Sequence, residues 1–216
     1  DGESIQSSLK TRYNKKAESE ANYSFPQKSL DLLGIRGKYA YDSGEDEEKF
    51  SAADLNASAF GKYETQKGEA YRTQADKATS SGAFSRLSDE GKDKALGYVE
   101  SYAEAVALKE NSGGQYEITT KWIQNAQEAQ KQYRIAPGVF AACKAAASEC
   151  EMLKDKDGDS IDYSKGLQIM EMLFRSGLNE QQRTAMYEYL DVPKKIRHWN
   201  RARVDEQLAI MRKKAA

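Results

Sequence analysis

Four aspartates lie close together between two apolar stretches, and their spacing gives the clearest candidate for metal chemistry. Asp155, Asp157 and Asp159 alternate along the chain, and Asp162 follows them. An EF-hand needs oxygen ligands at positions 1, 3 and 5, Gly at 6 and Glu at 12. Counted from Asp155, position 6 is a serine and position 12 a glycine, so the closing carboxylate is missing. The sequence favours a turn at the Asp-Gly pair, with a weak calcium site as the alternative.

The two cysteines and the single histidine could supply only three ligands, whereas a structural zinc site takes four. Cys143 and Cys150 lie seven residues apart in FAACKAAASECEML, which reads as helix. Seven helical residues span about 10.5 Å, beyond the roughly 7 Å limit on the Cα separation of a disulfide. We therefore expect two reduced cysteines packed as small apolar groups, and no cofactor.

The segment 193–216 has eight Lys or Arg residues against two acidic ones, although the whole chain is nearly neutral, with 33 basic and 34 acidic residues. The overall balance argues against a nucleic-acid-binding surface along the whole chain. Within the segment, five residues are candidates for phosphate contact, namely Lys194, Lys195, Arg197, Arg201 and Arg203. The alternative is an ordinary solvated helix face, because cations also complement the negative end of a helix dipole.

No pattern in the sequence points to catalysis. Walker, G-x-S-x-G, H-E-x-x-H and dinucleotide-binding motifs do not occur, and His198 has no Cys or Ser at catalytic spacing. No stretch approaches 18 consecutive apolar residues, so we expect no membrane-spanning helix. The sequence predicts a protein that is not an enzyme.

Helix signals recur from residue 84 onward, and no segment alternates as a strand would. We predict helices that begin at Ser88, at Thr119 or Thr120, at Pro137, at Ser164, at Asn179 and at Pro193. The third is expected to cover 137–153 and the last 193–213, while Gly177 ends the fourth. The predicted fold is all-α, an irregular bundle of about six helices with an extended, poorly packed N-terminal arm.

The expected arm covers residues 1–83, and the helical domain covers 84–216. Residues 1–80 contain only seven Ile, Leu, Val or Met, too few to offset chain entropy unaided. Short helical turns are expected at 29–35, and another helix could start at 43–50. The arm is either extended or ordered by a partner through its spaced aromatics. These partner anchors are Tyr23, Phe25, Tyr39, Tyr41, Phe50, Phe60, Tyr63 and Tyr71.

Four stretches carry a family resemblance over residues 84–192. They read LSDEGKDKALGYVESYAEAVALKE at 87–110, YEITTKWIQNAQEAQK at 116–131, DKDGDSIDYSKGLQIMEML at 155–173 and LNEQQRTAMYEYL at 178–190. In this order they resemble the C-terminal helical region of phage and prophage virion proteins of the internal or tape-measure-like type. The resemblance implies a place in a virion with a structural or DNA-delivery role, and it brings no catalytic residues.

These observations lead to one expected function and two alternatives. We expect a non-enzymatic bacteriophage virion protein, internal, ejected or tail-associated, that assembles with other virion proteins or with copies of itself. Its location would be the particle interior or tail, and the host cytoplasm during assembly. One alternative is a helical nucleic-acid-binding accessory protein that uses the basic C-terminal segment. The other is a weak calcium-binding module at 155–162.

Overall fold

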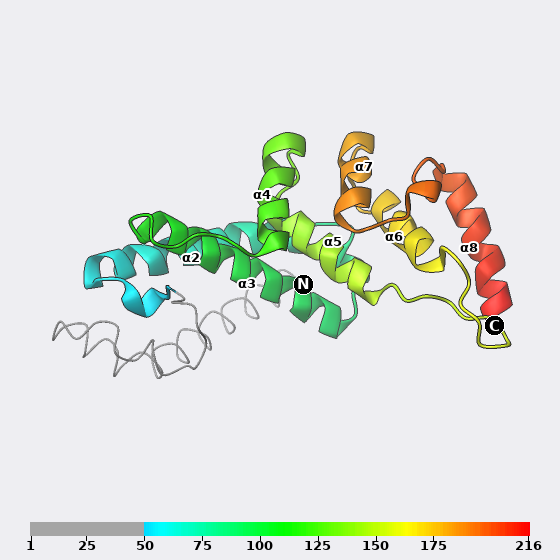
Figure 1. Cartoon of the computed structure of the whole chain (residues 1–216), viewed down its shortest axis with the longest axis horizontal. Helices are drawn as coiled ribbons and strands as arrows, with labels where there is room; N and C mark the ends of the chain where they lie inside the picture. The colour runs from blue at the N-terminus through cyan, green and yellow to red at the C-terminus, as the bar shows by residue number, and fades with distance from the viewer. Residues whose placement is uncertain (1–49) are drawn as a thin grey trace. The chain divides into compact units, whose positions relative to one another are not determined.

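The computed structural model describes residues 50–216, and these residues confirm the predicted all-α class. Within that range there are seven α-helices and no strand (Figure 1). They are α2 (Ala57–Thr79), α3 (Asp89–Asn111), α4 (Lys121–Tyr133), α5 (Pro137–Glu149), α6 (Ser164–Phe174), α7 (Glu180–Tyr189) and α8 (Arg201–Ala215). Short 3-10 turns lie at Ala52–Asp54, Phe84–Arg86 and Lys194–Ile196. The turns expected at 29–35 and most of the segment 43–50 lie outside the described residues.

Contacts divide the described residues into two compact units. The first unit contains 50–72 and Ser101–Thr119, and the second contains Thr73–Glu100 and Thr120–Ala216. Residues 57–79, which we expected in an arm of extended chain or short helices, form the 23-residue helix α2. Its buried positions Tyr63, Lys67, Tyr71 and Ala75 recur every four residues and so form one helix face.

The first unit contains a buried hydrophobic cluster. Its members are Leu55, Tyr63, Ala107 and Leu108, contributed by the chain before α2, by α2 and by the end of α3. The side-chain amide of Asn111 donates a hydrogen bond of 2.6 Å to Gln66 Oε1 and so links the same two helices.

The second unit is built around α5. Helix α5 packs on α4 and α6, α7 packs on α4 and α6, and α8 lies along α6 (Figure 1). The buried residues of α5 are mostly small, namely Pro137, Gly138, Phe140, Ala141, Ala142, Cys143, Ala145, Ala146 and Ala147. Small side chains on several faces allow close approach by neighbouring helices, which explains why an alanine-rich helix can occupy the centre.

Local capping signals gave the correct starts of four helices. The Ser88 hydroxyl accepts a 3.0 Å hydrogen bond from the backbone N–H of Gly91 and caps α3. Asn179 and Gln182 form the predicted capping box, with hydrogen bonds of 2.8 and 3.1 Å. Helix α4 begins after Thr120, and Pro137 is the first residue of α5, as predicted.

Helix α5 ends at Glu149, four residues before the expected end at 153. Its last carboxylate accepts hydrogen bonds from the hydroxyl and the backbone N–H of Ser88. The following residue, Cys150, has extended backbone angles. Ser88, 61 positions earlier in the chain, thus contacts the end of α5. No local sequence pattern predicts this contact.

Ser164 was predicted to cap the fourth helix, but it is the first residue of α6. Its buried hydroxyl accepts a 2.8 Å hydrogen bond from the backbone N–H of Leu153 and contacts the sulfur of Met152 at 3.0 Å. The serine therefore closes the preceding loop instead of satisfying a helix amide.

The predicted helix 193–213 is divided in two. A 3-10 turn at Lys194–Ile196 is followed by non-helical residues, and α8 begins at Arg201. Asn200 stops an uninterrupted helix because its side chain accepts a 2.9 Å hydrogen bond from the Arg203 N–H, and its own backbone is extended. Val204 and Leu208 point into the core as expected, whereas Trp199 and Met211 are only half-buried.

Candidate functional site

The aspartate loop between α5 and α6 is organised by Asp155. One oxygen of its carboxylate, Oδ1, accepts hydrogen bonds from the backbone N–H groups of Asp157 at 3.0 Å and Asp159 at 2.9 Å. The backbone N–H of Asp155 donates to the Asp159 carbonyl at 2.9 Å. Gly158 lies at the tip with a φ of +85°, which glycine adopts without strain. The predicted turn at the Asp-Gly pair is therefore present.

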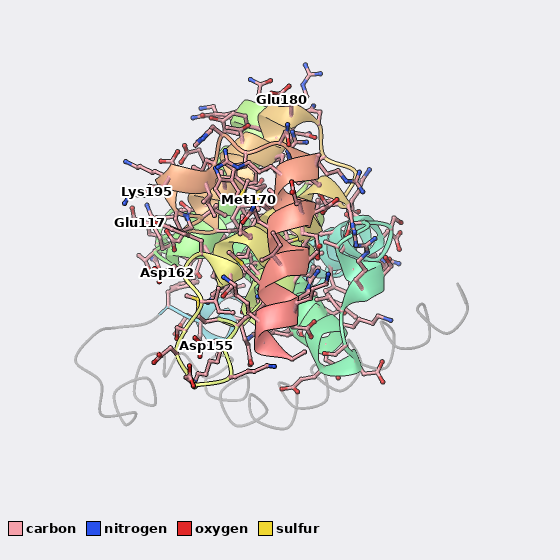
Figure 2. All side chains as sticks on the ribbon, turned by 90° about the vertical axis from the view of Figure 1, so that its right-hand side faces the viewer. Glu117, Asp155, Asp162, Met170, Glu180 and Lys195 are labelled. Atoms are coloured by element: carbon pink, nitrogen blue, oxygen red, sulfur yellow. The ribbon has the colours of Figure 1, made fainter. Side chains whose placement is uncertain are left out.

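Asp155 lies near the tip of this loop, whereas Asp162 lies near the start of α6 (Figure 2). Within residues 50–216, no group of three His, Cys, Asp or Glu side chains is placed to hold a metal ion. Calcium binding by Asp155, Asp157 and Asp159 stays a prediction, and the geometry gives Asp155 a role in the turn.

Replacing Asp155 with alanine should lower the free energy of unfolding by about 1–2 kcal/mol, because two backbone N–H groups lose a charged acceptor. Asp157→Ala is the matched control, since its side chain is exposed, and should change stability by less than about 0.5 kcal/mol. Urea unfolding of both variants measures the difference. Equal losses would show that Asp155 does not organise the loop.

The structure separates the five candidate phosphate-binding residues into different environments. Arg197 is engaged by the fold, because its Nε donates a 2.7 Å hydrogen bond to the Val192 carbonyl. Arg203 lies over the Trp199 ring, 3.9 Å from its centroid. Arg201 approaches Asp205 at 3.9 Å across an exposed i,i+4 pair. Lys194 and Lys195 are exposed.

The partner anchors also fall into groups. Tyr23, Phe25, Tyr39 and Tyr41 lie outside the described residues. Tyr63 and Tyr71 are buried, with 0% and 3% of their surface exposed, so neither is available as an exposed anchor. They occupy the buried face of α2, which explains the difference from the prediction. Phe50 and Phe60 are half-buried and pack against the core of the first unit.

Tyr116 is a further aromatic residue packed on the core of the first unit, and it was not among the predicted anchors. Its ring centroid lies 6.5 Å from that of Phe50, and it packs partly buried against the same core. Burial, followed by the charge of Glu104, raises the pKa of its hydroxyl. Tyr116 lies in the non-helical chain that follows α3. Phe50 is 66 positions earlier, and no helical spacing in the sequence indicates that the two residues are in contact.

Arg212 and Glu171 form an ion pair that was also missed. The two guanidinium nitrogens of Arg212 donate to the two carboxylate oxygens of Glu171 at 3.0 and 3.2 Å, joining α8 to α6. The hydrogen bond from Arg212 is the main cause that lowers the pKa of Glu171. No pattern in the sequence indicates a contact between these two charged residues, which are 41 positions apart.

Glu171→Gln should lower stability by about 0.5–1 kcal/mol near pH 7, a small value because half of the Arg212 side chain is exposed. The folded-state pKa of Glu171 is lowered, so the stabilising effect is present above the ordinary glutamate pKa of about 4.3. It is lost as the pH falls through the lowered value. Chemical unfolding at several pH values should therefore show the two proteins converging in acid. A constant difference down to pH 2 would contradict this linkage.

Both cysteines are free, as predicted. Cys143 is fully buried in α5, and burial raises the pKa of its thiol to about 12. Burial also raises the pKa of Cys150, to about 11. Thiolates are the reactive form, so neither environment favours nucleophilic chemistry.

The fold defines the chain as an all-α protein within residues 50–216, with a basic segment before α8 and a half-buried aromatic cluster in the first unit. Comparison with protein-family models, with curated proteins and with solved structures gave no match. Among the described helices, none combines the length and the apolar content that crossing a lipid bilayer would require.

Proposed function

We propose that this protein is a non-enzymatic structural component that acts by assembling with other protein subunits. The supporting observation is the aromatic cluster of the first unit. Phe50 and Tyr116 pack against the buried cluster of Leu55, Tyr63, Ala107 and Leu108, and both remain partly exposed. Aromatic side chains with one face packed and another exposed supply large contact areas with little loss of conformational entropy, and they are enriched at interfaces.

The particle to which it belongs is inferred from the sequence resemblance. Residues 84–192 resemble the helical end of internal or tape-measure-like phage virion proteins, which supports a location in the virion interior or the tail. The partners would be other virion proteins or further copies of this chain. The assignment to a virion is independent of the aromatic cluster, because such a cluster would contact other subunits equally well in any other kind of assembly.

The first experiment asks whether the protein is part of a particle. Phage particles purified on a density gradient from a strain that carries this gene should contain the chain at a fixed ratio to the capsid protein, measured by quantitative mass spectrometry. If the chain stays in the lysate and is absent from intact particles, the virion assignment is wrong.

The second experiment tests the aromatic cluster. A photoreactive phenylalanine placed at Tyr116 should crosslink to another subunit in assembled material. The matched control is Tyr98, which is also half-buried but is covered by Trp122 at 5.3 Å between ring centroids and by Lys144. Crosslinks from Tyr98 alone, or from neither position, would refute the cluster as an assembly surface even if the chain is found in particles.

A further inference from the structure

The basic residues near the C-terminus differ in what already engages them. Arg212 is paired through both carboxylate oxygens of Glu171, and Arg197 is held by the Val192 carbonyl. These two cations stabilise the fold. Lys194, Lys195 and Arg203 form no ion pair within residues 50–216, and Arg201 has only the exposed 3.9 Å approach to Asp205. Four cations with no strong internal partner therefore lie within ten residues, at 194–203, and Lys213 and Lys214 lie apart from them at the far end of α8.

The segment that carries the two lysines is fixed by its neighbours. Ile196, between the lysines and α8, has only 1% of its surface exposed. The backbone N–H of Trp199 donates to the Ile196 carbonyl at 3.0 Å, and Arg197 ties the segment back to Val192. Lys195 projects outward from the body of the second unit (Figure 2). The lysines are thus displayed from an ordered support, which reduces the entropy lost on binding.

Arg203 and Trp199 add a planar platform to this charge. The guanidinium carbon lies 3.9 Å from the centroid of the half-buried indole, and Arg203 is itself exposed. Nucleobases stack on aromatic rings and on guanidinium planes of this kind. The N-terminus of the 15-residue helix α8 adds the positive end of its dipole next to these groups.

No acidic residue occurs between Asp191 and Asp205, so the cations of this segment are not neutralised by neighbours along the chain. A surface with positive charge alone would accept any polyanion. The stacking platform, which follows the lysines in the same segment, favours a polyanion with exposed bases, because the bases of a duplex are stacked on one another and unavailable.

We propose that residues 194–203 form a binding surface for single-stranded nucleic acid. Lys194, Lys195 and Arg201 contact the phosphate backbone, while a base stacks on Arg203, which lies over Trp199. This inference goes beyond the assembly role and does not depend on it. It assigns no sequence preference, because phosphate contacts and stacking are tolerant of sequence.

The test compares two double variants that remove the same charge from exposed lysines. Lys194→Gln with Lys195→Gln should weaken binding of a labelled oligothymidylate about tenfold at 50 mM salt, measured by fluorescence anisotropy. It should also reduce the slope of log affinity against log salt by about 1.4, since each phosphate contact to a single strand contributes about 0.7. Lys213→Gln with Lys214→Gln, at the other end of α8, should change affinity less than twofold. Equal losses in both variants, or no binding by the unmodified protein, would overturn the proposal.

A second readout examines the stacking platform directly. The chain has two tryptophans, so Trp122→Phe leaves Trp199 as the sole indole reporter. Oligothymidylate should quench its fluorescence, and Arg203→Gln should diminish that quenching. A duplex of equal length and a polyglutamate of equal charge should compete poorly. If the duplex competes equally, the single-strand assignment is wrong, and if polyglutamate does, the surface recognises an acidic protein segment.

Discussion

Replacing Phe140 with alanine is expected to lower the free energy of unfolding by about 3–5 kcal/mol, the largest effect of any single side-chain truncation we predict. Phe140 has only 1% of its surface exposed and lies on α5, which contacts α4 and α6. Its ring also meets Tyr189 edge-on, with centroids 5.5 Å apart. Truncation would leave a cavity that the surrounding helices can fill only in part, and it would remove the aromatic contact as well.

Thermal and urea unfolding would measure this loss, with two companion variants as controls. Phe140→Leu keeps most of the volume and should cost less than half as much. Ser148→Ala alters an exposed residue of the same helix and should stay within about 0.5 kcal/mol of the unmodified protein. A loss below 1 kcal/mol for Phe140→Ala would show that α5 is not the centre of a packed core.

Adding a single methyl group at Gly138 should also destabilise the protein, by about 1–3 kcal/mol. A Cβ at this position would overlap the Gln74 carbonyl oxygen and lie 2.9 Å from the Ala78 backbone nitrogen. Both neighbours belong to the backbone of α2, which cannot move aside as a side chain could. The Gly138 N–H is also bonded to Gln74 Oε1 at 2.9 Å, so the two helices meet at close range.

Gly97 provides the matched control for this substitution. It lies within α3, and a Cβ built there has nothing within 4 Å. Gly97→Ala should therefore stabilise the protein by up to about 1 kcal/mol, because alanine has the higher helix propensity. Unfolding curves should move in opposite directions for the two Gly→Ala variants. Stabilisation by both would refute the close approach at Gly138.

The features that sequence reasoning predicted correctly are local. The Ser88 cap, the Asn179–Gln182 box and the start at Pro137 each depend on residues within one helical turn, so a short window contains the whole interaction. The all-α class follows from the same signals. At 193–213 the apolar spacing suggested one helix, because Ile196, Val204 and Leu208 do face the core. The Asn200 cap between Ile196 and Val204 interrupts that helix.

The features that were missed depend on distant or unusual partners. Ser164 has the residue type and position of a helix cap, but its hydroxyl accepts a hydrogen bond from the Leu153 N–H across the loop. Helix α2 falls within the expected arm because its buried face contains few aliphatic residues and includes Tyr63, Lys67 and Tyr71. Their spacing of four was visible in the sequence, and tyrosine and lysine can bury long apolar portions when their polar ends find partners. Of the candidate nucleic-acid residues, only the structure could separate Arg197, which the fold engages, from the exposed lysines.

The loop from Leu153 to Ser164 has a practical consequence for engineering. Its two ends are joined by the Leu153 N–H to Ser164 Oγ bond, by the 2.8 Å bond from the Ile161 N–H to the Leu153 carbonyl, and by the bridge between Lys154 and Ser160. The tip around Gly158 is exposed and has open space around it. Lengthening a loop whose ends are already held together costs little. An epitope or fluorescent peptide inserted at this tip should leave α5 and α6 in place, and would provide a handle for following the protein in a cell.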